Sequence, residues 1–112
     1  MTEIKVFKKG DVYTKIICDG HTGYGVFGED IVCAALSSIV QTAALGMLGV
    51  AGANVVIKRD DKVGYFEISI PNNLSQSCAH DVQVIFATMM CGLTDLHSQY
   101  SDFIEMEVQD VL

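Results

Sequence analysis

Hydrophobic and polar residues alternate along the first part of the chain. In residues 2–8, Ile4 and Val6 are separated by charged side chains, and residues 12–18 are rich in β-branched types. The intervening Lys9-Gly10-Asp11 has the composition of a tight turn. The pattern predicts a first β-hairpin over residues 2–18.

Residues 31–47 change to a helical period. At about 100° per residue, one group of hydrophobic side chains shares a single arc, and Ser37, Ser38, Gln41 and Thr42 lie opposite. That group is Val32, Ala35, Leu36, Ile39, Val40, Ala43 and Met47. Asp30 precedes the pattern and has the chemistry of an N-cap. We therefore predict an amphipathic helix that begins at Ile31.

The uncharged stretch of residues 31–57 exceeds the ~20 residues that a membrane-spanning helix needs. Polar residues interrupt it, glycines divide its second half, and acidic rather than basic residues precede it. We therefore expect a helix, a turn and a strand, with no membrane partner.

In the second half of the chain, the pattern predicts two further strands, a second helix and a last strand. Residues 54–59 and 62–70 read as strands joined at Asp60-Asp61, and Pro71-Asn72-Asn73 ends the second strand. A helical period then runs to about residue 98, and residues 104–108 alternate again. Its apolar positions are Val82, Ile85, Phe86, Met89, Leu93 and Leu96. The predicted order is ββαββαβ, an α+β fold with two layers and a mainly antiparallel sheet.

Size and composition support one domain over residues 1–112. The chain has 112 residues, 50% of them hydrophobic, which is enough for one core but not for two domains. The 14 acidic residues outnumber the 7 basic ones and give a net charge of −7. Without a basic cluster, nucleic-acid binding is not expected. An acidic surface favours cationic partners, or it serves solubility alone.

The cysteines suggest a reducing compartment. The first residues lack the apolar run of a secretory signal, so we expect a cytoplasmic protein whose thiols are reduced. Most of the four cysteines should be small buried hydrophobes, with Cys18 and Cys91 structural. We expect at least one cysteine to differ from these buried structural residues.

His21 and Cys33 carry complementary chemistry. His21 lies in a glycine-rich segment, and Cys33 is the third residue of the predicted helix, where the positive end of the dipole favours a thiolate. Its helical angle borders the polar arc, so we expect partial exposure. A thiolate beside an imidazole can perform acyl transfer, and N–H groups at the helix start can stabilise an oxyanion. The alternative is a core cysteine and a solvated histidine.

The surrounding residues resemble a known family. The run Gly20-His21-Thr22-Gly23-Tyr24 is followed by a short spacer and then by Asp30-Ile31-Val32-Cys33-Ala34-Ala35-Leu36-Ser37. This closely resembles the ribosomal-processing cysteine protease family, often called Prp. Its signature is a Gly-His-x-Gly-Tyr loop, then Gly-x-Asp-Ile-Val-Cys-Ala-Ala and a Ser. Length, acidity and element order extend the resemblance more weakly along the chain.

The resemblance implies a function and site residues. It implies a cytosolic homodimeric endopeptidase that removes the N-terminal extension of a large-subunit ribosomal protein, the one numbered twenty-seven. His21 matches the catalytic histidine and Cys33 the nucleophile. Asp30 matches as a helix cap or an orienter of His21, and Ser37 as a polar neighbour of the sulfur. Thr22 stands where the family commonly has Ala, a departure that concerns loop packing.

The segment between the first hairpin and the first helix is rich in glycine, which leaves its backbone conformation unusually unrestricted. Gly20, Gly23, Gly25 and Gly28 lower its order, so we expect a mobile loop that closes when a peptide binds. Ribosomal proteins are typically basic, and the acidic surface suits such a substrate.

Three other functions fit parts of the sequence. Gly23-Tyr-Gly25-Val-Phe-Gly28 matches the dinucleotide-binding pattern, although antiparallel signals dominate the chain. A zinc site could combine Cys18-x-x-His21 with Cys78-x-His80, but the spacing is irregular. A Met-rich helix with Met89 and Met90 suits a non-enzymatic interaction module, although such a stripe is more often core. We expect the protease, without metal or cofactor.

Overall fold

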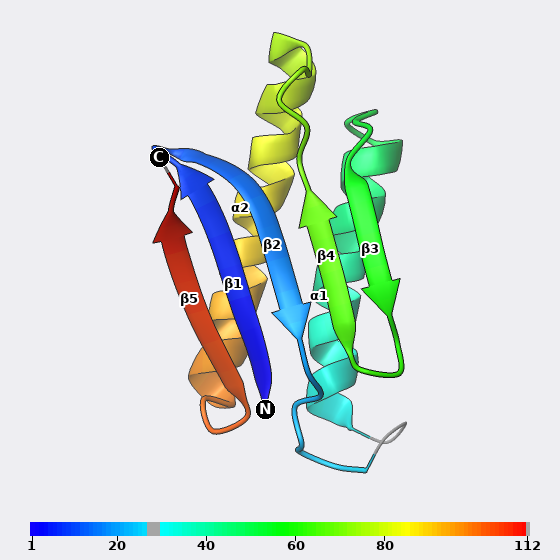
Figure 1. The fold of residues 1–112 in the computed structure, drawn as a ribbon, viewed down its shortest axis with the longest axis vertical. Helices are drawn as coiled ribbons and strands as arrows, with labels where there is room; N and C mark the ends of the chain where they lie inside the picture. The colour runs from blue at the N-terminus through cyan, green and yellow to red at the C-terminus, as the bar shows by residue number, and fades with distance from the viewer. Residues whose placement is uncertain (27–29, 112) are drawn as a thin grey trace.

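The structure, a computed structural model, describes residues 1–26 and 30–111. The predicted order ββαββαβ is confirmed (Figure 1). The elements are β1 (Thr2–Lys9), β2 (Val12–Asp19), α1 (Ile31–Gly49), β3 (Val56–Asp60), β4 (Tyr65–Ser69), α2 (Gln76–Gln99) and β5 (Ile104–Asp110).

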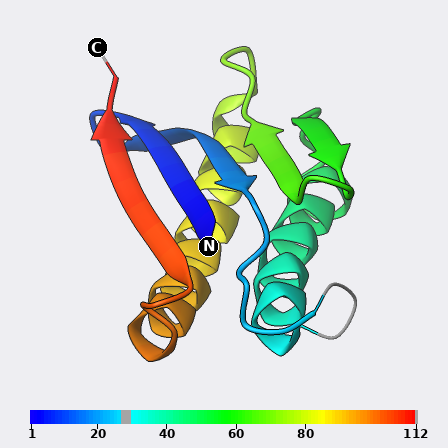
Figure 2. The same ribbon diagram turned by 60° about the horizontal axis from the view of Figure 1, so that its bottom comes forward.

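One five-stranded sheet forms the first layer, with strand order β3-β4-β2-β1-β5. Neighbouring strands in the sheet are antiparallel, except that β1 and β5 are parallel. Both helices lie against the same face of this sheet, antiparallel to each other (Figures 1 and 2). The α+β prediction with two layers and a mainly antiparallel sheet is therefore confirmed.

The core lies between the sheet and the helices. Alternation along the strands directs Ile4, Val6, Ile16 and Ile68 inward, and each is at most 1% exposed. Phe86 of α2 is fully buried and stacks on Tyr13, with ring centroids 4.5 Å apart. Each such side chain contributes about 1.5–3 kcal/mol by leaving water.

Helix α1 supplies one side of this core. Its 18-residue window reaches a mean hydropathy of 1.9, so length and composition alone would allow it to cross a membrane. In the structure its apolar arc packs on the sheet, while Leu45 and Leu48 stay exposed. The buried residues are Val32, Leu36, Val40, Ala43, Ala44 and Met47. The predicted helix, turn and strand within residues 31–57 are confirmed.

The starts of β3 and β4 differ from the sequence prediction, which placed them at residues 54 and 62. β4 begins at Tyr65 rather than at residue 62, because residues 61–64 form the turn of the second hairpin. Gly64 adopts φ 69°, a left-handed conformation that other residues rarely adopt, and the turn ends at this glycine. Helix α2 begins at Gln76, well before its first apolar position, because the Ser75 side chain accepts a hydrogen bond from the Cys78 N–H.

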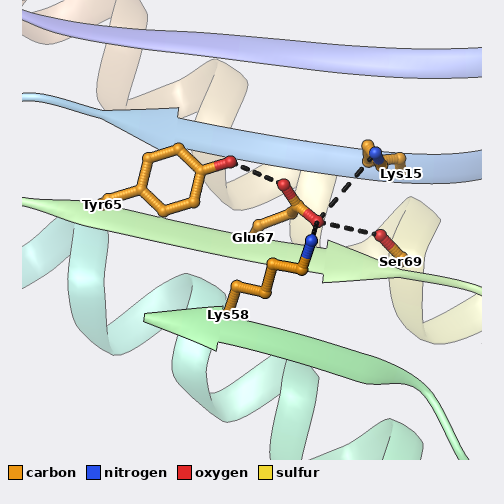
Figure 3. A network of polar contacts seen from close by, with 5 residues as sticks. All are labelled: Lys15, Lys58, Tyr65, Glu67 and Ser69. Carbon is orange, nitrogen blue, oxygen red and sulfur yellow. Dashed lines mark hydrogen bonds and ion pairs between the residues drawn. The ribbon is translucent and has the colours of Figure 1, made fainter. Parts of the chain in front are cut away.

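A polar cluster lies on the face of the sheet opposite the helices (Figure 3). Glu67, in the middle of β4, is only 5% exposed. Its carboxylate accepts hydrogen bonds from the Tyr65 hydroxyl at 2.5 Å and the Ser69 hydroxyl at 3.1 Å. The ammonium groups of Lys15 and Lys58 lie 3.9 and 4.0 Å away. The Tyr65 hydrogen bond, with the bond from Ser69 and the two lysines, holds the pKa of Glu67 below its ordinary value, against the effect of burial.

We predict that Tyr65 ionises well above the ordinary pKa of a tyrosine. Its hydrogen bond to Glu67, together with burial, raises its pKa to about 12. The neutral phenol therefore stabilises the fold below the ordinary pKa of 10.0, and this contribution is lost as pH rises through about 12. Tyrosinate absorbance should show this late step; Tyr65→Phe should remove it and Glu67→Gln should move it to lower pH. Identical titration curves for wild type and Glu67→Gln would contradict the assignment.

Candidate active site

The start of α1 is fixed by Asp30. As predicted, Asp30 is the N-cap, and its Oδ1 accepts a hydrogen bond from the Cys33 N–H at 2.9 Å. The backbone carbonyl of Asp30 accepts from the Ala34 N–H at 3.0 Å. Cys33 is therefore the third helical residue, and it is half-buried, as its helical angle predicts.

The other oxygen of Asp30 holds the glycine-rich loop. Oδ2 accepts hydrogen bonds from the Thr22 hydroxyl at 2.5 Å and from the Tyr24 N–H at 3.1 Å. Burial opposes ionisation of Asp30, but the bonds from Thr22 and from the N–H groups of Cys33, Gly25 and Tyr24 lower its pKa overall. One ionised carboxylate therefore joins the loop after His21 to the helix that carries Cys33.

Aromatic contacts hold the same loop from the opposite side. The Tyr24 ring meets Phe103 edge-on at 5.2 Å and Tyr100 at 5.7 Å between centroids. Both partners belong to the segment between α2 and β5, at the end of the molecule where α1 begins (Figure 2). Such contacts are worth about 0.5–1.5 kcal/mol beyond the area they bury.

The loop begins at a position where only glycine fits. Gly20 adopts φ 95°, and a Cβ there would lie 2.7 Å from the carbonyl oxygen of Met1. The Gly20 carbonyl accepts a hydrogen bond from the Thr2 hydroxyl at 2.8 Å. The start of β1 therefore sets the direction in which the chain enters the loop.

The imidazole of His21 contacts the second hairpin. Its Nε2 lies 3.2 Å from the carbonyl oxygen of Lys62, within hydrogen-bonding distance. The preceding residue adds a backbone bond, because the Gly20 N–H donates to the Gly64 carbonyl at 3.0 Å. The turn between β3 and β4 therefore supports the imidazole.

One pocket of about 430 Å³ brings the predicted site residues together. His21 and Cys33 both line it, as do Asp30 and Ser37. Of the loop glycines, Gly20 and Gly25 also line it, and Gly23 adopts φ 78° within the loop. Gly28 lies outside the described residues. The pocket thus combines a thiol at a helix N-terminus with an imidazole, the groups required for acyl transfer.

The cysteines have different environments, and all four are free. Cys18 is buried, and burial raises its pKa to about 12, so its thiol stays neutral and unreactive at ordinary pH. Cys78 is half-buried and its Sγ donates to the Ala51 carbonyl at 3.3 Å. The expectation that Cys91 is structural is wrong, because it lies on the exposed side of α2.

The geometry does not support the proposed zinc site. His21 lies at the start of α1, whereas Cys78 contacts Ala51, just beyond its end. A helix of 19 residues is about 28 Å long, so one ion cannot bind both pairs. Within residues 1–26 and 30–111, no group of three or more His, Cys, Asp or Glu side chains is placed to hold a metal.

The other two alternatives also lose their support. β2 is antiparallel to both of its neighbours, unlike the strand that precedes a dinucleotide-binding loop. Met89 and Met90 are 3% and 9% exposed and belong to the core. The Met-rich stripe is therefore packing rather than a docking surface.

Sequence reasoning missed the contribution of the second hairpin. Arg59, Asp61 and Gly64 line the pocket together with His21. Arg59 and Asp61 form an ion pair at 2.7 Å on the hairpin. Their contribution depends on the sheet order, which places β4 beside β2 and which short-range patterns do not reveal.

Comparison with known proteins points to one family. A family model described as Cysteine protease Prp matches residues 1–105. The chain belongs to the Prp cysteine protease family. It is thus a peptide hydrolase of the cysteine class, as the resemblance implied.

Relatives of the Prp family match most of the chain. The ribosomal processing cysteine protease Prp of Staphylococcus aureus is 31% identical over 105 residues, 93% of each chain. Prp of Bacillus subtilis is 25% identical over 83 residues, 74% of each chain. A crystal structure of S. aureus Prp with a covalently linked product peptide has a TM-score of 0.86 at 25% identity, covering 97% of this chain and 100% of that one.

Proposed function

We propose that this protein is an endopeptidase that removes the N-terminal extension of a large-subunit ribosomal protein, the one numbered twenty-seven. The observation that carries the proposal is the shared pocket of His21 and Cys33 at the start of α1. Membership of the Prp family supports the substrate class, since curated members are named ribosomal processing proteases. The acidic surface, with a net charge of −7, favours a basic substrate.

Acylation begins with the Cys33 thiolate. Its sulfur attacks the carbonyl carbon of the scissile peptide bond and forms a C–S bond. The C–N bond then breaks, and the protonated His21 imidazole gives its proton to the leaving amine. The result is a thioester between Cys33 and the extension, with a neutral imidazole beside it.

Deacylation uses the same groups in reverse roles. The neutral imidazole of His21 takes a proton from water, whose oxygen attacks the thioester carbon. The C–S bond breaks, and Cys33 returns to the thiolate form beside a protonated His21. The extension leaves as a carboxylic acid, which then loses its proton to solvent. Charge and protons balance over the two steps, with one water consumed.

The oxyanion needs donors other than the two amides at the nucleophile. The N–H groups of Cys33 and Ala34 already donate to Asp30. The sequence-based expectation that helix-start N–H groups stabilise the oxyanion therefore does not extend to these two. Ser37 is half-buried one turn after Cys33 and lines the same pocket. We propose it as a polar neighbour of the sulfur, as the family resemblance implies.

Two further parts of the proposal follow from the family resemblance. We place the protein in the cytoplasm, where precursors of ribosomal proteins occur, and we propose a homodimer. Exposed apolar side chains at the end of α1 and on α2 suit a partner surface. They are Leu45, Leu48, Val50 and Val84. Light scattering of the purified protein tests the dimer, and a monomeric mass at all concentrations would refute it.

The purified protein should shorten the ribosomal precursor at one bond. We expect mass spectrometry to find a single truncated product and the released extension, because acyl transfer cuts one positioned peptide. The matched control is the same ribosomal protein made without its extension, which should remain intact. An uncut precursor, or equal cleavage of both forms, would refute the proposed substrate.

A further inference from the structure

We infer that the β3–β4 turn, residues 61–64, positions the catalytic imidazole and determines which of its nitrogens exchanges protons with Cys33. The inference rests on the roles proposed for His21 and Cys33. It assigns the backbone carbonyl of Lys62 the orienting role that an Asn or Asp side chain has in other thiol and serine proteases.

Two hydrogen-bonding contacts connect the turn to the start of the loop. The Lys62 carbonyl oxygen lies 3.2 Å from His21 Nε2, and the Gly64 carbonyl accepts from the Gly20 N–H at 3.0 Å. One contact holds the ring and the other holds the backbone just before it. The turn therefore contacts both the imidazole and the backbone that leads into it.

The chemistry of the acceptor determines the tautomer. A carbonyl oxygen can only accept a hydrogen bond, so the His21 Nε2 must carry a hydrogen to use this contact. In the neutral ring Nδ1 then has the lone pair, and in the protonated ring Nδ1–H is the second donor. Nδ1 is therefore the nitrogen that takes a proton from Cys33 or from water and gives one to the leaving amine.

Gly64 makes the close approach of the turn and the loop feasible. It adopts φ 69°, and a Cβ there would lie 3.0 Å from the Gly20 carbonyl carbon and oxygen and 3.1 Å from His21 Cε1. Two of these neighbours are backbone atoms, which cannot rotate away. A side chain at this position therefore requires the Gly20 backbone and the His21 ring to shift by a few tenths of an ångström.

Among the described residues, the other charged groups that line the pocket make contacts of their own. Asp30 binds the loop beyond His21, through Thr22 and Tyr24. Arg59 and Asp61 pair with each other on the hairpin. The Lys62 carbonyl, 3.2 Å from His21 Nε2, is the acceptor to which we assign the orienting role.

The test compares Gly64→Ala with Gly10→Ala. Gly10 lies in the β1–β2 turn with φ 63°, and a Cβ there meets nothing within 4 Å. Both variants therefore carry a similar backbone strain, but only Gly64→Ala displaces His21. We expect Gly64→Ala to lower kcat by roughly 10–100-fold with KM changed by less than about threefold, and Gly10→Ala to keep both.

Two readouts do not depend on turnover. Iodoacetamide should alkylate Cys33 more slowly at neutral pH in Gly64→Ala, with its pH profile moved upward, because the imidazole no longer pairs with the sulfur. Long-range ¹H–¹⁵N correlation spectra should show the Nε2–H tautomer of His21 in wild type and Gly10→Ala, and a mixture of tautomers in Gly64→Ala. Similar thermal midpoints in the two variants would confirm that their strain is matched.

A second change weakens the acceptor without adding a side chain, and it covers the case in which Gly64→Ala fails to fold. Semisynthesis can replace the Val63 amide nitrogen with oxygen, so that Lys62 presents an ester carbonyl, a poorer hydrogen-bond acceptor. The matched control is the same ester at Asp11, in the other hairpin turn. We expect the Val63 ester to shift the alkylation profile of Cys33 and the Asp11 ester to leave it unchanged.

The outcomes separate this inference from the proposed function. Equal alkylation profiles and tautomers in the Gly64→Ala and Gly10→Ala variants, or in the two esters, would overturn the inference while wild-type cleavage stands. A wild type in which Cys33 reacts no faster than Cys91 would instead refute the proposed nucleophile. The tautomer measurement would still report whether Lys62 holds the ring.

Discussion

Replacing Cys33 with alanine should lower kcat/KM for precursor cleavage by roughly 10⁴–10⁶-fold, the loss typical of removing a covalent nucleophile. The reason is chemical rather than structural. Cys33 is half-buried, and the hydrogen bond that caps α1 uses its backbone N–H, which alanine retains. The variant should therefore fold normally. Cleavage followed by mass spectrometry and a thermal unfolding curve measure the two effects separately.

Cys91→Ala provides the matched control for this substitution. Cys91 is exposed on α2 and does not line the pocket, so the change should leave cleavage at the wild-type rate. Cys18 lines the pocket, but its pKa of about 12 keeps its thiol neutral. A Cys33→Ala protein that still cuts the precursor would show that another group attacks the peptide bond.

Asp30→Ala should weaken both the fold and the catalytic rate. It removes the cap of α1, which costs about 0.5–2 kcal/mol, and it leaves Thr22 and Tyr24 without their acceptor on Asp30. We expect the free energy of unfolding to fall by about 2 kcal/mol or more, since two further bonds to a charged group are lost. The loop that carries His21 would lose its link to the helix that carries Cys33. We expect kcat to fall by roughly 10–100-fold.

Ser75→Ala is the matched control, because Ser75 caps α2 through the Cys78 N–H and has no part in the pocket. It should lose about 1 kcal/mol of stability and keep wild-type cleavage. Asp30→Asn should recover the cap, because its amide oxygen still accepts from the Cys33 N–H, but only part of the rate. Equal rates in Asp30→Ala and Ser75→Ala would mean that Asp30 is a helix cap and nothing more.

The pH dependence of stability gives Asp30 a second signature. Its pKa is lowered in the folded protein, so its contribution is present above the ordinary carboxyl pKa of 3.8 and is lost as pH falls through the lower folded value. Wild type should therefore lose more stability in acid than Asp30→Ala does. Denaturant unfolding at neutral and acidic pH measures this difference.

The features predicted correctly are those that short-range chemistry determines. Asp30 caps α1 through the residue three positions later, so the sequence around it suffices to place Cys33 at the helix start. Alternation in β1 and the helical period of α1 likewise identify the inward side chains, such as Ile4 and Val40. The order of elements follows from the same local patterns.

The features that were missed depend on distant parts of the chain. The Lys62 carbonyl reaches His21 across 41 positions, and only the pairing of β4 with β2 brings the two together. The role of Thr22 was missed because its hydroxyl donates a hydrogen bond to Asp30, which lies 8 positions further along the chain. Cys91 was misjudged because hydrophobic character alone does not fix which side of α2 a residue occupies.

The start of β5 lies beside the start of β1, and this arrangement links the edge of the sheet to the catalytic pocket. The Phe103 carbonyl accepts from the Thr2 N–H at 3.0 Å, Thr2 binds Gly20, and Phe103 supports the Tyr24 ring. Loosening β5 should therefore also loosen the loop that carries His21, although β5 itself does not line the pocket. Native-state hydrogen exchange measures this coupling, because the amides of β5 and of the loop should open together.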